Sequence, residues 1–227
     1  MAETIQDQKG RPATRWSSNV NRAGEPFGGG VPLALLAIAI TLLGFWRSFF
    51  SQLGNVDFAH QLHGWLSTGW LVLVLVQASL IGFRKFKWHR VLGWSSVALF
   101  TLLIITSFHM LTLMLAGVGP LAQPFEMAKI FGYSDVTALP LLIIAYVSAI
   151  VLRKDRHVHS RLISVTLFAG LLPAAARMFF GVLVMSGLAK VETREEILQG
   201  LSLAIHPTYI FVLVVLGVAA LMDWRKG

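Results

Sequence analysis

The chain has 227 residues, of which 56% are hydrophobic and only 13% are charged, whereas roughly a quarter of the residues in a soluble domain are charged. Its net charge of +8 does not indicate a nucleic-acid-binding protein, because the Lys and Arg residues lie in short runs between apolar blocks. The sequence contains no cysteine, which excludes disulfides, thiolate metal sites and Cys nucleophiles. Too little polar sequence is left for a second, soluble domain.

The first 30 residues are polar and end in a run of three glycines. A secretory signal would place its apolar stretch closer to the N-terminus. We therefore interpret residues 1–30 as a disordered cytoplasmic tail, and residues 31–227 as one transmembrane domain.

Six apolar blocks follow the tail, each about as long as the roughly 20 helical residues that cross a hydrocarbon core of about 30 Å. Continuous apolar runs predict helices and not barrel strands, because each backbone amide must find its hydrogen bond within its own segment. The predicted spans cover residues 31–50, 58–83, 91–117, 136–152, 162–188 and 201–224. The sequence therefore predicts an all-α, polytopic membrane helix bundle of about six transmembrane helices.

The connections between these blocks differ in charge. Threading the chain through six spans puts fourteen Lys and Arg on the side of the two termini and four on the opposite side. By the positive-inside rule, both termini are expected to be cytoplasmic.

Local patterns in the connections make three further predictions. Residues 120–135 mix apolar and charged side chains, which favours a short interfacial helix on the outer side. Thr193-Arg194-Glu195-Glu196 has the spacing of a capping box and predicts the start of the last helix. The basic turns at Arg84-Lys85 and Arg153-Lys154 are followed by His89 and His159, a similarity that suggests two related helical hairpins or a chance likeness of basic turns.

The histidines fall into two groups. His89, His157 and His159 lie among Lys and Arg, and we interpret them as polar residues at the membrane surface, near lipid head groups. Most tryptophans lie near predicted interfaces and are interpreted as belt anchors; these are Trp46, Trp65, Trp70, Trp88, Trp94 and Trp224.

Five ionisable residues are predicted within the outer half of the bilayer, namely His60, His63, His109, His206 and Arg177. His60 and His63 are spaced i, i+3 and share one helix face. Ionisable side chains inside spans tend to face the bundle interior and mark functional sites. Arg177 needs an acidic partner, a carbonyl or an anionic ligand, and the predicted spans contain no acidic residue except Asp223, at the end of the last span. The nearest acidic residues are Asp57 and Glu126 at the outer edge.

Three interpretations of this cluster remain open. His63, His109 and His206 are candidate ligands of a b-type haem, with Arg177 paired to a propionate. The four imidazoles of His60, His63, His109 and His206 are also candidate ligands of a metal ion. Alternatively, each His makes only polar contacts between helices. No catalytic motif is present, so no catalytic residue is assigned.

Several stretches stand out along the chain: His60-Gln61-Leu62-His63-Gly64-Trp65, Gln77, Trp88-His89-Arg90-Val91-Leu92-Gly93, His159-Ser160-Arg161-Leu162 and Ala176-Arg177. Together they resemble an uncharacterised family of bacterial multi-spanning membrane proteins. The six-span layout is also similar to di-haem b-type cytochromes, although the His spacing differs.

The leading expectation from the sequence is a protein of the bacterial inner membrane that binds haem or a metal for electron transfer, with quinone as a redox partner. The alternatives are an accessory subunit of a larger respiratory or photosynthetic membrane complex, and a small transporter. The lipid bilayer is the expected surrounding, and no nucleic-acid partner is expected.

Overall fold

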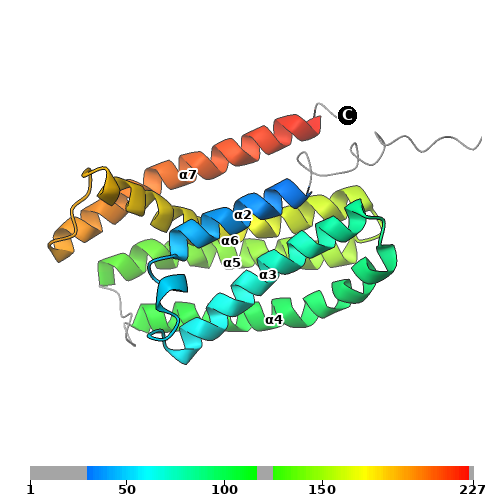
Figure 1. Ribbon diagram of the computed structural model, residues 1–227, viewed down its shortest axis with the longest axis horizontal. Coiled ribbons are helices and arrows are strands. Elements are labelled where there is room, and N and C mark those ends of the chain that lie inside the picture. The colour runs from blue at the N-terminus through cyan, green and yellow to red at the C-terminus, as the bar shows by residue number, and fades with distance from the viewer. Residues whose placement is uncertain (1–29, 117–124, 225–227) are drawn as a thin grey trace, which may run out of the picture.

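The computed structural model describes residues 30–116 and 125–224. In these residues all secondary structure is helical, which confirms the predicted all-α fold (Figure 1). The elements are α2 (Gly30–Phe45), the short 3₁₀ helix η3 (Phe50–Gln52), α3 (Phe58–Gly82), α4 (Phe86–Ala116), α5 (Phe125–Val151), α6 (Arg156–Met185) and α7 (Arg194–Trp224). The predicted tail, residues 1–30, lies outside the described residues except for Gly30.

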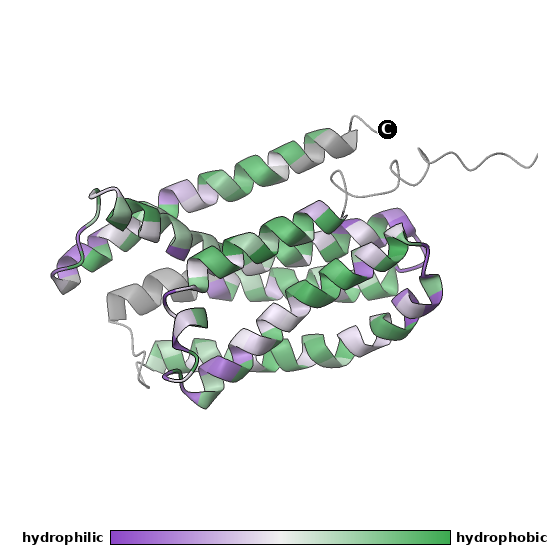
Figure 2. Cartoon of the chain, in the orientation of Figure 1, coloured by the Kyte–Doolittle hydropathy of each residue, from purple (hydrophilic) through white to green (hydrophobic). Residues whose placement is uncertain are grey.

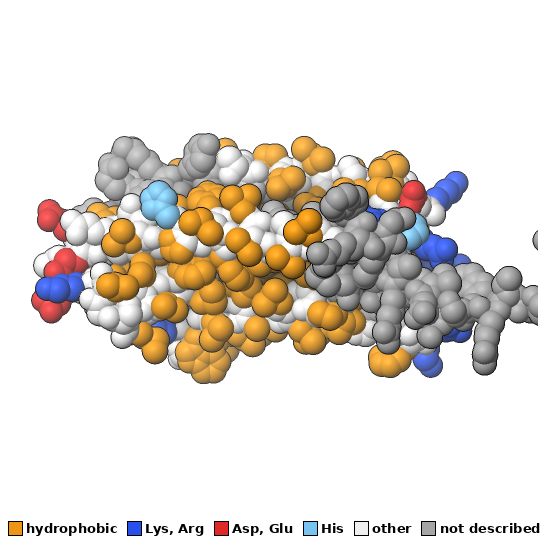
Figure 3. Space-filling model, turned by 90° about the horizontal axis from the view of Figure 1, so that it is seen from above, with side chains coloured by type: hydrophobic (Ala, Val, Ile, Leu, Met, Phe, Trp, Pro, Cys, Tyr) orange, Lys and Arg blue, Asp and Glu red, His pale blue; other side chains and the backbone are white. Residues whose placement is uncertain are grey.

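The helices have the length and composition of membrane helices. Among the described residues, α3, α4, α6 and the part Glu195–Val215 of α7 are long and apolar enough to cross a membrane. α2 and the part of α5 after Asp135 are apolar but shorter. Hydrophobic residues dominate the middle of the helices (Figure 2), and the charged side chains of one face gather at the two ends of the molecule (Figure 3). The chain is therefore a helical membrane protein.

Five helices form a closed ring. Each helix from α2 to α6 packs against the next one along the chain, and α6 packs back against α2. α7 lies outside this ring, and most of its contacts are with α6 (Figure 1). Side chains from α2 to α6 therefore face a common interior, whereas α7 packs against the ring mainly through α6.

Side-chain caps determine where several helices begin. Asp57 accepts hydrogen bonds from Ala59 N and His60 N at the start of α3, and Asp155 accepts from His157 N and Val158 N at the start of α6. Before α7, Glu196 N donates to Thr193 Oγ1 and Thr193 N donates to Glu196 Oε2. These two bonds form a capping box, which confirms that prediction.

Three helices begin before the membrane spans that the sequence predicts. α4 and α6 begin several residues before the predicted spans, because their basic first turns are already helical. The separate interfacial helix predicted for residues 120–135 is not present in its described part: α5 begins at Phe125 and runs through Asp135 without a break. No proline separates Phe125 from Asp135, so the polar first turns continue into the apolar span. Residues 120–124 lie outside the described residues.

Small residues allow α2 and α6 to pack closely. Ala34 and Ala37 of α2 are almost fully buried, as are Ala174 and Ala175 of α6. A Cβ atom added at Gly44 would lie 2.1 Å from the carbonyl oxygen of Ala174, which is closer than van der Waals contact allows. This is the small-residue packing that membrane helices use to approach one another.

We predict that Gly44→Ala destabilises the protein by about 1–3 kcal/mol, because α2 must move away from the backbone of α6. The midpoint of thermal unfolding in detergent should fall accordingly. Gly181→Ala in α6 is the matched control, since a Cβ there meets nothing within 4 Å and Ala favours a helix by about 1 kcal/mol over Gly. Equal midpoints for Gly44→Ala and the unmodified protein would contradict the proposed close contact.

Candidate functional site

The interior of the ring contains a cavity of about 410 Å³, a volume within the range of small-molecule sites. All five ring helices and the connection between α2 and α3 contribute to its lining. Its walls are mostly apolar or aromatic, and four ionisable side chains line it: His60, His63, Asp135 and Arg177. The structure thus brings together three of the five ionisable residues predicted from the sequence, and adds Asp135.

Arg177 is half-buried, and its guanidinium lies among groups that compensate its charge. Its Nη1 donates a hydrogen bond of 3.0 Å to the carbonyl oxygen of Pro173, one turn earlier in α6. Its guanidinium lies 4.7 Å from the centre of the Phe45 ring, within the range of a cation–π interaction. Asp135 of α5 interacts with it electrostatically. These contacts join α2, α5 and α6 around one charge.

Asp135 is the acidic partner that the sequence analysis missed. The sequence predicts Asp57 and Glu126 as the nearest acidic residues, because the fourth span is expected to begin at residue 136. Since α5 begins at Phe125, Asp135 lies inside a helix and lines the same cavity as Arg177. A buried guanidinium needs a carboxylate partner, and this was the only indication of Asp135 in the sequence. Such a need does not tell which acidic residue is the partner.

His63 is held in one tautomer by a hydroxyl group of the neighbouring helix. Its Nδ1 lies 3.2 Å from Oγ1 of Thr106 in α4. The Thr106 hydroxyl donates its own proton to the carbonyl oxygens of Leu102 and Leu103, so it accepts from Nδ1–H of His63. The Ser67 hydroxyl, 3.4 Å from Nε2, donates to the carbonyl oxygen of His63 at 2.8 Å. Nε2 of His63 therefore has a lone pair for a further partner.

An aromatic cluster borders the cavity, and its member Trp70 forms part of the cavity wall. Trp70 of α3 packs edge-on against Phe100 of α4 and Tyr146 of α5, and these two rings are stacked 3.9 Å apart. The Tyr146 hydroxyl lies 2.8 Å from Ser96 Oγ. Trp70 lines the cavity and is only 4% exposed, so its interpretation as a belt anchor was wrong. Its indole N–H is buried and has no hydrogen-bond partner in the described residues.

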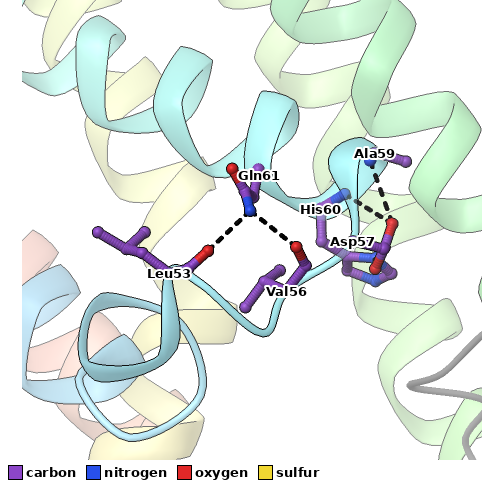
Figure 4. A network of polar contacts seen from close by, with 6 residues as sticks. All are labelled: Leu53, Val56, Asp57, Ala59, His60 and Gln61. Carbon is purple, nitrogen blue, oxygen red and sulfur yellow. Dashed lines mark hydrogen bonds and ion pairs between the residues drawn. The ribbon is translucent and has the colours of Figure 1, made fainter.

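The connection between α2 and α3 closes the opposite end of the cavity. Its residues Phe49 and Phe50 line the cavity, and Phe49 packs so tightly on Gly64 that a Cβ there would lie 2.3 Å from the ring. Gln61 Nε2 holds the connection by donating to the carbonyl oxygens of Leu53 and Val56, at 2.7 and 2.8 Å (Figure 4). At the start of α3, the Asp57 carboxylate pairs with the His60 ring.

The structure does not bring His109 and His206 into the cavity. Ser107 and Met110 are on the face of α4 that lines it, and His109 lies about 100° round the helix from Met110, with an exposed side chain. His206 is exposed on α7, outside the ring. No three His, Asp or Glu side chains in residues 30–116 and 125–224 lie close enough together to hold a metal ion. Among the described residues, the imidazoles at the cavity therefore come from α3 alone.

The histidines at the Lys/Arg-rich end also differ from their interpretation as surface residues. His157 is exposed, as expected. His89 and His159 are half-buried, and their rings meet with centroids 6.5 Å apart. Both residues lie in the first turn of a helix that begins earlier than the sequence predicted.

The comparisons with known proteins identify no relative, since no family model, curated protein or solved structure matches the chain. The resemblances noted from the sequence therefore remain predictions.

The Asp57–His60 pair predicts a pH-dependent contribution to stability. Partial burial raises the pKa of Asp57, but hydrogen bonds from the His60 and Ala59 amides, together with the His60 ring, outweigh it and lower the pKa below its ordinary value of 3.8. A carboxylate whose pKa is lower in the folded state stabilises the fold above the unfolded pKa, and this contribution disappears as the pH falls through the folded pKa.

We expect Asp57→Asn, which keeps a capping oxygen, to lower the midpoint of thermal unfolding at about pH 6. Near pH 2–3 the variant and the unmodified protein should converge, because protonation then removes the same charge. A difference between the two midpoints that stays constant across this range would show that the Asp57 charge does not stabilise the fold.

Proposed function

We propose that the protein is a quinone-binding component of electron transfer in the bacterial inner membrane, and that the ring cavity holds the quinone head group. The observation that carries this proposal is the combination of Arg177, His63 and Trp70 on the walls of one apolar cavity of about 410 Å³. A ligand that enters from the lipid phase must itself be largely apolar, and its few oxygens must match these polar groups.

The polar groups of the cavity complement both oxidation states of a quinone. The guanidinium of Arg177 is a hydrogen-bond donor, and so is the indole N–H of Trp70, which has no partner among the described residues. Both are suited to a quinone carbonyl oxygen. Nε2 of His63 is an acceptor, suited to the hydroxyl of the reduced quinol. The aromatic rings of Phe45 and Phe49 line the same cavity and offer flat surfaces on which a planar ring stacks.

The charge balance of the cavity also favours a neutral ligand. Asp135 compensates the charge of Arg177, so the pair is close to neutral before any ligand binds. A strongly anionic ligand would have to displace Asp135 and leave its carboxylate without a partner in an apolar surrounding, which is costly. A quinone accepts a hydrogen bond from the guanidinium and leaves the pair intact.

The second candidate is a haem with a single axial imidazole. One observation favours it: the Nδ1–H of His63 is held by Thr106, which leaves Nε2 oriented as a ligand, as in many metal-bound histidines. A haem between two imidazoles on facing helices fits the described residues less well, because the imidazoles that line the cavity, His60 and His63, come from one helix.

Purification in mild detergent, followed by organic extraction and mass spectrometry, tests the proposal directly: a quinone should be recovered in near-stoichiometric amount. Binding of a short-chain quinone should weaken about 10- to 100-fold in the double variant Arg177→Met/Asp135→Asn, as expected for loss of a hydrogen bond to a charged group. The double variant removes both charges together, so it leaves no unpaired buried charge.

His109→Ala is the matched control, because His109 is exposed and lies outside the cavity lining; it should bind the quinone normally. A Soret band that His63→Ala abolishes would favour the haem candidate instead. Colourless protein that contains no quinone and binds none would overturn both, and stable co-purification with other subunits would then favour an accessory role.

A further inference from the structure

Two imidazoles meet at the Lys/Arg-rich end of the ring, on the far side of the aromatic cluster from the cavity, and a glutamine whose backbone contacts one of them lies beside them. The three residues are Gln77 near the end of α3, His89 in the first turn of α4 and His159 in the first turn of α6. The rings of His89 and His159 are 6.5 Å apart between centroids. Each histidine lies in the first turn of a helix that follows a basic turn. The two similar basic turns noted in the sequence therefore place two imidazoles next to each other.

The hydrogen bonds of the two histidines leave one nitrogen of each ring free to act as a ligand. His159 Nδ1 lies 2.8 Å from the carbonyl oxygen of Ala149. A carbonyl oxygen only accepts, so Nδ1 carries the proton and Nε2 of the neutral ring has a lone pair. The His89 ring contacts the backbone of Gln77, while its Nδ1 is buried and has no partner in the described residues.

Gln77 adds an oxygen to these two nitrogens. Its Oε1 is buried and also lacks a hydrogen-bond partner among the described residues. Buried polar atoms without partners are rare in folded proteins, and each one needs an explanation. Here two occur in contacting residues beside a further imidazole that has a lone pair. All three are electron-pair donors, and together they fit a Lewis acid.

The geometry suits one metal ion between two imidazoles. Each nitrogen lies about 2.0–2.1 Å from a bound metal, and each ring centroid lies behind its nitrogen. A centroid separation of 6.5 Å therefore fits two imidazoles on opposite sides of one ion. Backbone carbonyls that hold the other ring nitrogen, as Ala149 does for His159, are a usual feature of metal-bound histidines.

The positive charges nearby do not exclude a cation. The side chains of Arg84, Lys85, Arg153 and Lys154 are exposed, and salt screens exposed charges over about 8 Å at physiological ionic strength. Arg161, two residues after His159, is half-buried and has other interactions. The ligand atoms of Gln77 and His89 are instead buried, so they interact with an ion at shorter range and with less screening.

We propose that Gln77, His89 and His159 form a second site, which binds a divalent transition-metal ion that accepts tetragonal nitrogen and oxygen ligands, such as Cu²⁺ or Ni²⁺. The two imidazoles bind on opposite sides, Gln77 Oε1 binds between them and water completes the coordination. The site is separate from the cavity, and the proposal does not depend on the ligand of the cavity.

Titration of tag-free protein in detergent with Cu²⁺ tests the site. We expect one equivalent to bind with an electron paramagnetic resonance spectrum split by two imidazole nitrogens. His89→Ala and His159→Gln should each remove one nitrogen from this pattern and weaken binding at least about 10-fold. The Gln in His159→Gln keeps a donor for the Ala149 carbonyl, so this variant preserves the helix contact. Gln77→Leu should weaken binding with both nitrogens retained.

His157→Ala is the matched control, because His157 lies on the same helix two residues before His159 and is exposed. It should leave the stoichiometry and the spectrum unchanged. If His157→Ala reduces binding as much as His159→Gln does, or if His89→Ala and His159→Gln leave binding unchanged, Cu²⁺ binds adventitiously at surface histidines and the proposal is overturned. Thermal unfolding of each variant, measured without metal, separates loss of the site from loss of the fold.

Discussion

The buried charge of Arg177 is the constraint on which the arrangement of the ring depends. A guanidinium inside an apolar bundle is permanently charged, and its burial is costly unless several groups compensate it. α6 supplies the carbonyl of Pro173, α2 supplies the face of Phe45 and α5 supplies the carboxylate of Asp135. Because these groups come from three helices, the compensation of one charge also determines how α2, α5 and α6 lie relative to one another.

The same ring separates two polar regions by an aromatic layer. The cavity, with Arg177 and His63, lies on one side of Trp70, Phe100 and Tyr146; Gln77, His89 and His159 lie on the other. Apolar aromatic packing of this kind excludes water, so polar atoms on either side have few partners other than one another or a bound ligand. This explains why the unpartnered atoms of the described residues, Trp70 Nε1, Gln77 Oε1 and His89 Nδ1, belong to these two regions.

Some of the site could be predicted because its residues are local in sequence. His60 and His63 are one turn apart on one helix, so their shared face follows from helix geometry alone. His109 and His206 could not be assigned in the same way. Their depth in the membrane was predictable from the spans, but their direction depends on the rotation of α4 and on the place of α7 outside the ring. Asp135 was missed because the first turns of α5 are polar, and hydropathy alone placed its start too late.

The sequence by itself determined the helical class, the apolar spans and the capping signals, because backbone hydrogen bonding in lipid and side-chain capping act within a few residues. Only the tertiary structure decided that α2 to α6 close into a ring, that α7 lies outside it and that His89 meets His159. Lipid is as apolar as the helix surfaces, so hydrophobicity does not determine which face of a membrane helix turns inward. The inward face of each helix is instead determined by close contacts, such as that of Gly44 with Ala174, and by the groups that compensate the charge of Arg177.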